Sequence, residues 1–225
     1  MAARSPRREV HKFGGASLAD AAAIRGATEL IVSRKGPQVV VVSAIAGITD
    51  LLLGLIRAAE LGDHAALETG SREFRSRHHR IARELLPARH VRAVATEIDR
   101  ASDELDAIVR ALIVLREASP RVRDHLVSRG ERLSARLLAA ALDASARKSH
   151  LVDATDAIIT DGRHGDAAPD IIATRTAVRG SMVPLLKGDA VVVVPGFLGR
   201  APDGSTTTLG RGGSDLTATT LARAL

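Results

Sequence analysis

The stretch AVVVVPGFLG, residues 190–199, contains five consecutive apolar residues, which are followed directly by a Pro-Gly pair. An apolar run without polar alternation is typical of a strand that is buried on both faces, as in a parallel sheet. Three further short runs, at 10–13, 39–42 and 150–152, are separated from it and from one another by segments with helical periodicity. This alternation predicts an α/β fold, with a mostly parallel sheet sandwiched by helices.

The helical segments include a long hairpin. Apolar residues from Val91 to Leu115 recur every three or four positions, which predicts one long amphipathic helix. A second helix is expected before Pro87, so that a hairpin spans about 63–120 and packs on the sheet rather than forming a separate domain. Within it, His78 and His79 point about 100° apart, so packing or solvated roles are favoured over a shared metal. Another helix is expected over 171–186.

Composition excludes several classes of protein. The 225 residues are 45% hydrophobic and contain no Cys, which excludes disulfide scaffolds, thiolate zinc sites and cysteine nucleophiles. The net charge of +6 comes mostly from seven arginines within residues 72–92, best explained as a solvated helix face. Because Trp and Tyr are absent, the stacking platforms of single-strand binders cannot be built, and we expect no nucleic-acid partner.

No membrane segment is expected. The longest apolar stretch, 39–56, contains Asp50, which would be costly to bury in a bilayer. The start, Met1–Lys12, is basic but lacks the apolar segment of a secretory signal. We therefore expect a cytoplasmic protein.

The first predicted strand is followed by KFGGAS, residues 12–17. Gly14 and Gly15 allow backbone N–H groups to approach an anion, and Lys12 offers a positive charge for a phosphate. The motif matches neither the P-loop nor the dinucleotide-binding pattern. Taken alone, it is most simply explained as a tight turn.

The second predicted strand is followed by SAIAGITD, residues 43–50. The hydroxyls of Ser43 and Thr49 suit a carboxylate or a phosphate. Thr49 or Asp50 could equally be the N-cap of a helix that begins at Leu51, and capping is the simpler interpretation of this segment alone.

A glycine interrupts the helical pattern at SRGE, residues 128–131. Gly inside a helix costs about 1 kcal/mol relative to Ala, so Gly130 needs a reason. Close approach of a ligand beside the carboxylate of Glu131 would supply one. The alternative is that Glu131 is a solvent-exposed side chain.

The fourth predicted strand leads into PGFLGRAPDGSTTTLGRGGSD, residues 195–215. Glycines flank Arg211, and Ser214 and Asp215 follow directly at the start of another helix. A linker has no need of Arg and Asp inside a Gly-rich turn after a buried strand. The segment therefore predicts an anion site with an arginine clamp and a nearby carboxylate. The preceding TDGRHGDAAP, residues 160–169, is expected to be a loop.

Together these four segments, in this order and spacing, resemble aspartokinases of the amino-acid kinase superfamily. The resemblance covers essentially the whole chain, and its last segment is the most specific. The helical hairpin resembles the extended insertion found in lysine-sensitive and bifunctional bacterial members. The resemblance implies that residues 1–225 are the N-terminal, aspartate- and phosphate-binding portion of an amino-acid kinase (carbamate kinase-like) catalytic domain.

The resemblance implies a reaction as well as a fold. The γ-phosphoryl group of ATP, with Mg²⁺ bound through ATP, would pass to the β-carboxylate of L-aspartate, giving 4-phospho-L-aspartate, the first step towards lysine, threonine and methionine. Lys12 and Asp215 would be catalytic, with Asp215 orienting Lys12. Glu131 would bind the α-ammonium group and Arg211 the α-carboxylate. The other implied residues are Phe13, Gly14, Gly15 and Ser214 for phosphate, and Ser43, Thr49, Phe197, Ser214 and Asp215 for aspartate.

Two departures from the family pattern matter. His164 stands where the family usually carries Phe, and the chain ends one helix after GRGGSD, whereas the family continues into a nucleotide-binding half and regulatory domains. We therefore expect a fragment or a truncated product of a protein that is a homo-oligomer at full length. Two alternatives stay open: a non-catalytic chain that binds aspartate or assembles with a partner, and another amino-acid kinase of the glutamate type.

Overall fold

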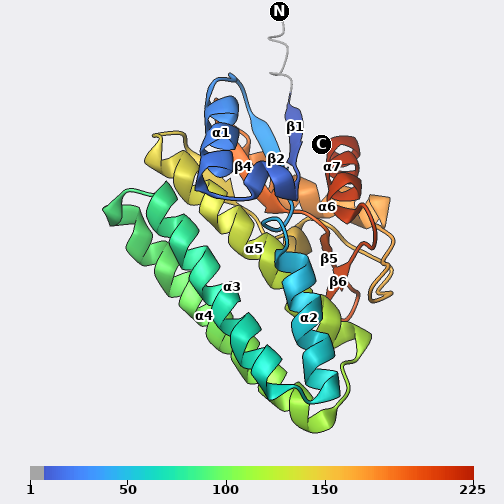
Figure 1. Cartoon of the computed structure of the whole chain (residues 1–225). Coiled ribbons are helices and arrows are strands. Elements are labelled where there is room, and N and C mark those ends of the chain that lie inside the picture. The colour runs from blue at the N-terminus through green and yellow to red at the C-terminus, as the bar shows by residue number, and fades with distance from the viewer. Residues whose placement is uncertain (1–7) are drawn as a thin grey trace, which may run out of the picture.

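The computed structural model describes residues 8–225, so the expectation about the first seven residues of the basic start lies outside the described part. All four expected strands form and pair in parallel in one sheet, in the order β1-β2-β4-β3. Figure 1 labels three of them, β1, β2 and β4. Their bounds are β1 (Glu9–Phe13), β2 (Gln38–Val42), β3 (Ser149–Leu151) and β4 (Val191–Pro195). The predicted α/β fold with a parallel sheet is confirmed.

The valines of the two central strands explain why these runs are continuously apolar. Val40 and Val42 of β2 pack into a core on one face of the sheet, whereas Val39 and Val41 pack into a second core on the other face. The valines of β4 alternate between the two cores in the same way. Both faces of the sheet are therefore buried, as expected for a parallel sheet covered by helices.

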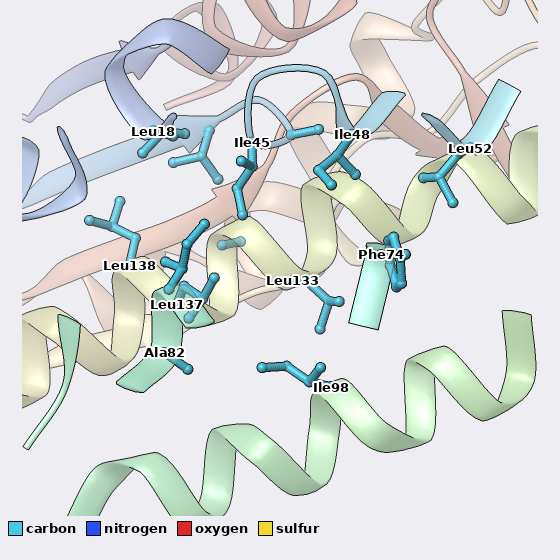
Figure 2. Packing of buried hydrophobic residues seen from close by; sticks show 14 of the residues in the cluster. Leu18, Ile45, Ile48, Leu52, Phe74, Ala82, Ile98, Leu133, Leu137 and Leu138 are labelled. Atoms are coloured by element: carbon cyan, nitrogen blue, oxygen red, sulfur yellow. The ribbon is translucent and has the colours of Figure 1, made fainter. Parts of the chain in front are cut away.

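The first face carries most of the helices. α1 (Ala21–Val32) and α5 (Pro120–Ala144) pack on it, and α2 (Ile48–Leu61) follows β2 (Figure 1). The expected hairpin is present as α3 (His64–Leu85) and α4 (Ala88–Leu115). Its expected position on the sheet is wrong: it packs against α2 and α5, and α5 separates α4 from the sheet (Figure 2). The apolar side of the hairpin contacts α2 and α5 rather than the sheet, because α5 already covers β2, β3 and β4.

The second face is covered by α6 (Ile171–Ser181) and α7 (Gly213–Ala224). α6 ends before the expected Leu186, and a short 3-10 helix, Val183–Leu185, follows around Pro184. Two further strands, β5 (Leu198–Arg200) and β6 (Thr206–Thr208), form an antiparallel hairpin that the sequence analysis did not predict. Within residues 8–225, no helix has both the length and the apolar character needed to cross a bilayer.

Candidate functional site

A cavity of about 240 Å³ lies at the carboxyl ends of β1, β2 and β4, beside the start of α7. It brings together most of the residues expected from the sequence. Its wall consists of Lys12, Ser43, Thr49, Glu131, Phe197, Gly210, Gly212, Gly213, Ser214 and Asp215. Phe13 and Arg211 lie next to wall residues in the chain, and Gly14 and Gly15 follow within three residues of Lys12, but none of these four lines the cavity.

Lys12 contributes the positive charge of this cavity. It is the residue before the last one of β1, and its Nζ lies 3.0 Å from Oδ1 of Asp215 in the first turn of α7. Gly14 lies beside the ammonium group: a Cβ there would lie 3.4 Å from Nζ, which is an ordinary van der Waals contact. Phe13 is buried and its carbonyl accepts a hydrogen bond from the N–H of Ser43 at 3.0 Å. This bond joins the end of β1 to the start of the loop after β2.

Glu131 contributes a buried carboxyl group. Only 4% of the residue is exposed, and its Oε2 has no hydrogen-bond partner. Burial raises the pKa of Glu131 to about 8, although the N–H groups of Glu131 and Ala44 and the charge of Arg132 oppose the rise. The alternative interpretation, that Glu131 is a solvent-exposed side chain, is therefore wrong. A buried oxygen without a partner at a cavity wall favours a ligand that brings a donor or a positive charge.

Gly130 has a structural reason that differs from the expected one. A Cβ at Gly130 would lie 2.9 Å from Cβ of Ala44 and 3.2 Å from Cγ2 of Ile48. The glycine therefore lets α5 approach the loop after β2, and the expectation that it admits a ligand is wrong. This close approach is what brings Glu131 to the N–H of Ala44.

The loop after β2 is held from two sides. Ser134 donates from its hydroxyl to the carbonyl of Ser43 at 2.5 Å, and Arg77 of α3 donates from Nη2 to the carbonyl of Ala46 at 2.6 Å. Arg77 therefore reaches from the hairpin to the site, although the sequence placed it only in a solvated basic face. No sequence signal distinguishes it from its neighbouring arginines.

The start of α2 corrects the interpretation of Thr49. α2 begins at Ile48 and its N-cap is Gly47, with a φ of 78°. Neither Thr49 nor Asp50 caps a helix beginning at Leu51, because both already lie in the first turn of α2. The side chain of Thr49 is therefore available to the cavity, whose wall it lines.

The Gly-rich turn closes the cavity on the side of α7. Phe197 has a φ of 71°, a left-handed conformation that is strained for a bulky residue. Gly213 is required beside it, because a Cβ there would lie 2.6 Å from Cδ2 of Phe197. Arg211 lies between two wall glycines, is exposed, and makes no ion pair within residues 8–225. Its guanidinium group is free to meet an anion.

A larger cavity, of about 410 Å³, lies between α4 and α5, but its chemistry is different. Its buried and half-buried arginines are already paired: Arg129 with Glu104, Arg132 with Asp153 and Arg136 with Glu97. The smaller cavity instead offers a buried carboxyl oxygen without a partner, Oε2 of Glu131, near the ammonium group of Lys12, and the free guanidinium group of Arg211 belongs to a residue between two of its wall glycines. It fits a small molecule with one cationic group and more than one anionic group.

Sequence comparisons show which known proteins this chain is similar to. The model of the amino acid kinase family matches residues 7–225. Lysine-sensitive aspartokinase 3 of Escherichia coli (strain K12) is 34% identical over 96% of this chain, and aspartokinase 1, chloroplastic, of Arabidopsis thaliana is 37% identical over 96%. The chain spans 46% of the first relative and 38% of the second, so it corresponds to less than half of either.

Solved structures show the same relationship. A crystal structure of E. coli aspartokinase III in complex with lysine and aspartate has a TM-score of 0.87 and 33% identity, covering 96% of this chain and 46% of that one. A second structure of that enzyme, in complex with aspartate and ADP, also has a TM-score of 0.87, with 32% identity over 97% of this chain and 47% of that one. The fold similarity therefore extends over nearly all of the chain.

Proposed function

The chain belongs to the amino acid kinase family, and we propose that it acts as an aspartate kinase that transfers the γ-phosphoryl group of ATP to the β-carboxylate of L-aspartate. The product would be 4-phospho-L-aspartate, which leads towards lysine, threonine and methionine. Similarity to aspartokinases over 96% of the chain supports the substrate. Because the chain spans less than half of these relatives, their activity as whole proteins is part of the proposal.

One observation carries the choice of ligand: the buried Oε2 of Glu131, which has no hydrogen-bond partner, lies in the same cavity as Lys12. In the proposal Glu131 binds the α-ammonium group of aspartate, and the exposed Arg211 binds its α-carboxylate through paired N–H donors. The β-carboxylate then faces Lys12. Ser43, Thr49, Phe197 and Ser214 line the space between these groups.

The co-substrate in this proposal is ATP, with Mg²⁺ bound to its phosphates. The lysine fits this role, because it is part of the cavity wall and its carboxylate partner, Asp215, has a side chain that is 67% exposed, so solvent screens their attraction. Phe13, Gly14, Gly15 and Ser214 would present backbone groups to the phosphate beside it. Mg²⁺ would offset phosphate charge.

The chemistry asks little of the protein beyond positioning. A β-carboxylate is already ionised at neutral pH, so no base is needed to activate it. Its oxygen forms the new bond to the γ-phosphorus while the bond to the bridging oxygen of ADP breaks and ADP takes the electron pair. Lys12, oriented by Asp215, would stabilise the negative charge that shifts during transfer.

The test measures ADP release and trapping of the acyl phosphate by hydroxylamine, with L-aspartate and L-glutamate compared. We expect turnover with aspartate and little with glutamate. Arg211→Lys should raise the KM for aspartate about tenfold or more, because a point charge cannot replace a bidentate clamp. Arg163→Lys, at another exposed arginine, is the matched control and should leave KM unchanged.

The alternatives predict different results. A chain that binds aspartate without catalysing transfer would give calorimetric binding but no ADP. Faster turnover with glutamate would favour the glutamate-type kinase. A cytoplasmic location and a homo-oligomer stay predictions, and some relatives carry the word chloroplastic in their names.

A further inference from the structure

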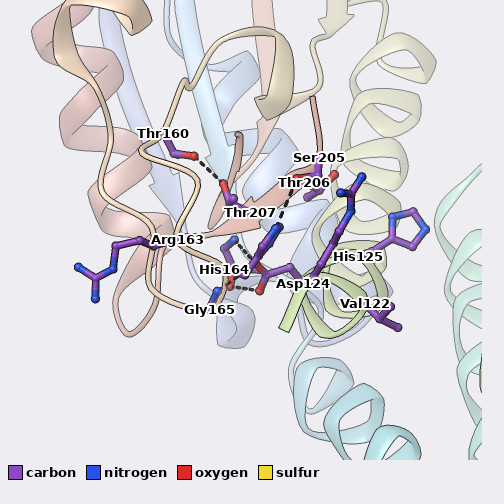
Figure 3. Close-up of polar contacts among 12 residues, drawn as sticks. Val122, Asp124, His125, Thr160, Arg163, His164, Gly165, Ser205, Thr206 and Thr207 are labelled. Atoms are coloured by element: carbon purple, nitrogen blue, oxygen red, sulfur yellow. Dashed lines mark hydrogen bonds and ion pairs between the residues drawn. The ribbon is translucent and has the colours of Figure 1, made fainter. Parts of the chain in front are cut away.

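Asp124 is a buried carboxylate that the proposed mechanism does not use. Only 3% of the residue is exposed, and it lies in the first half of α5. It accepts four hydrogen bonds: at Oδ1 from Oγ1 of Thr208 (2.6 Å), and at Oδ2 from the N–H of Thr208 (3.2 Å), the N–H of Gly165 (3.0 Å) and Nδ1 of His164 (2.9 Å). Figure 3 shows His164 and Gly165 facing this carboxylate.

These bonds join the two elements that carry the proposed aspartate contacts. Glu131 lies seven residues after Asp124 on α5, which places it on nearly the same face and about 10 Å along the axis. Thr208 ends β6, and Arg211 follows three residues later. A single carboxylate therefore connects the helix of Glu131 to the strand that leads to Arg211.

The loop 161–168 strengthens this connection. Ala167 donates its N–H to the carbonyl of Thr208 at 2.9 Å, next to the two bonds that His164 and Gly165 make with Asp124. Further along, a Cβ at Gly210 would lie 2.5 Å from Oδ1 of Asp166. The loop thus packs directly against the first glycine of the Gly-rich turn, and it has little room to move without displacing that turn.

We propose that Asp124 is a positioning residue that fixes the separation between Glu131 and Arg211 and so sets the chain length of the amino dicarboxylic acid that the cavity accepts. This inference rests on the proposed function. Aspartate and glutamate differ by one methylene group, so a pocket whose two ends are held at a fixed separation rejects the longer molecule. Without the Asp124 bonds, Arg132 still donates to Oγ1 of Thr206 at 3.3 Å, but the end of β6 nearer the turn is no longer bonded to α5. The turn can then move outward, which weakens aspartate binding and narrows the preference for aspartate over glutamate.

The test compares two neighbouring buried threonines. Thr208→Val removes the hydroxyl that binds Asp124, whereas Thr207→Val removes a hydroxyl that binds Oγ1 of Thr160 at 2.9 Å. Both residues lie on β6 and are nearly inaccessible to solvent, at 3% and 0% exposed. Each of the two threonine variants loses one buried hydrogen bond, so we expect both to lower the free energy of unfolding by a similar amount. Asp124→Asn is the stronger variant.

The measurement is the Kd for L-aspartate and L-glutamate, determined by calorimetry on the 225-residue chain, with the binding stoichiometry as a check on folding. We expect Asp124→Asn to weaken aspartate binding about tenfold or more, Thr208→Val severalfold and Thr207→Val less than twofold. The Kd for glutamate divided by the Kd for aspartate should fall by similar factors in Asp124→Asn and Thr208→Val, and should stay unchanged in Thr207→Val.

Three outcomes decide the matter. If the wild type binds aspartate and the two threonine variants behave alike, the positioning role is overturned. The same holds if Asp124→Asn lowers only the stoichiometry and leaves both Kd values unchanged. A wild type that does not bind aspartate overturns the proposed function itself and this inference with it.

Discussion

At the scale of single residues, the charge state of Glu131 is the most informative property of the site. Burial raises its pKa to about 8, so the free protein carries a largely neutral carboxyl group at pH 7. An ammonium group bound to it favours the ionised form. Ligand binding and proton release are therefore coupled at this side chain.

We expect aspartate binding at pH 7 to release a proton. The affinity should rise with pH, by up to tenfold per pH unit below about 8, and then level off, because above that value the free carboxyl group is already ionised. Calorimetry in two buffers with different ionisation enthalpies measures the proton release directly. Glu131→Gln should bind weakly and show no such pH dependence; an unchanged pH dependence in this variant would assign the proton to another group.

Single residues also show how far the sequence could predict the site. Lys12, Glu131 and Asp215 were placed by motif, and the structure brings all three to one cavity. Asp124 and Arg77 were not predicted as parts of the site, because their roles depend on contacts with Thr208 and Ala46, far away in the chain. Such contacts leave no local pattern in a sequence.

At the scale of elements, the contact between α5 and the loop after β2 depends on one missing side chain. Gly130 lies against Ala44 and Ile48, whereas Gly54 in α2 has no atom within 4 Å of the position that a Cβ would take. Both glycines are helical, but the position of a Cβ is crowded at Gly130 and open at Gly54.

We expect Gly130→Ala to lower the free energy of unfolding by about 1–3 kcal/mol through overpacking, and to weaken aspartate binding by moving Glu131. Gly54→Ala should instead stabilise the protein by up to about 1 kcal/mol, since Ala is the better helix former. Urea denaturation of both variants, with calorimetry for aspartate, checks this. Equal stabilisation by the two changes would show that α5 does not need the close approach.

A buried histidine makes the α3–α4 hairpin sensitive to acid. His78 is 0% exposed, its Nδ1 donates to the carbonyl of Phe74 at 2.7 Å, and its Nε2 has no partner. Burial lowers the pKa of His78 to about 4. Between pH 6.5 and 4 the unfolded chain therefore binds a proton that the folded chain does not.

Stability should fall as the pH drops through this window. The shift of about 2.5 units corresponds to a loss of about 3 kcal/mol in the free energy of unfolding by pH 4. Urea denaturation at pH 7 and pH 4.5 measures the loss. His78→Leu should lose much less between these two pH values, whereas His64→Gln, at an exposed position, should behave like the wild type.

Element boundaries were predictable where they rest on repeated patterns. The four strands and the long helices follow from apolar periodicity, which depends on neighbours in the chain. The β5–β6 hairpin was missed because each strand has only three residues and lies among glycines and threonines. The start of α2 was misplaced because its N-cap is a left-handed glycine rather than a side-chain acceptor.

At the scale of the whole molecule, the cavity lies where the two cores meet. α5 brings Glu131 from the core on the first face of the sheet, and α7 brings Ser214 and Asp215 from the core on the second face. A ligand that contacts both sides connects them. It should therefore stabilise the molecule as a unit.

We expect saturating L-aspartate, at about 100 times its Kd, to add about 2.7 kcal/mol and to raise the Tm of the 225-residue chain by about 5–10 °C. Succinate, which has both carboxylates but no ammonium group, should give little or no shift, because it leaves Glu131 without a partner. Thermal denaturation followed by circular dichroism gives both values. Equal shifts from the two compounds would remove Glu131 from the binding site.

The position of α5 has a consequence for hydrogen exchange. Its central turns contact the hairpin, the sheet and the loop after β2, so their amide hydrogens can reach solvent only when most of these contacts open together. In deuterated buffer, α5 should therefore be the slowest segment to take up label, at a rate set by global unfolding.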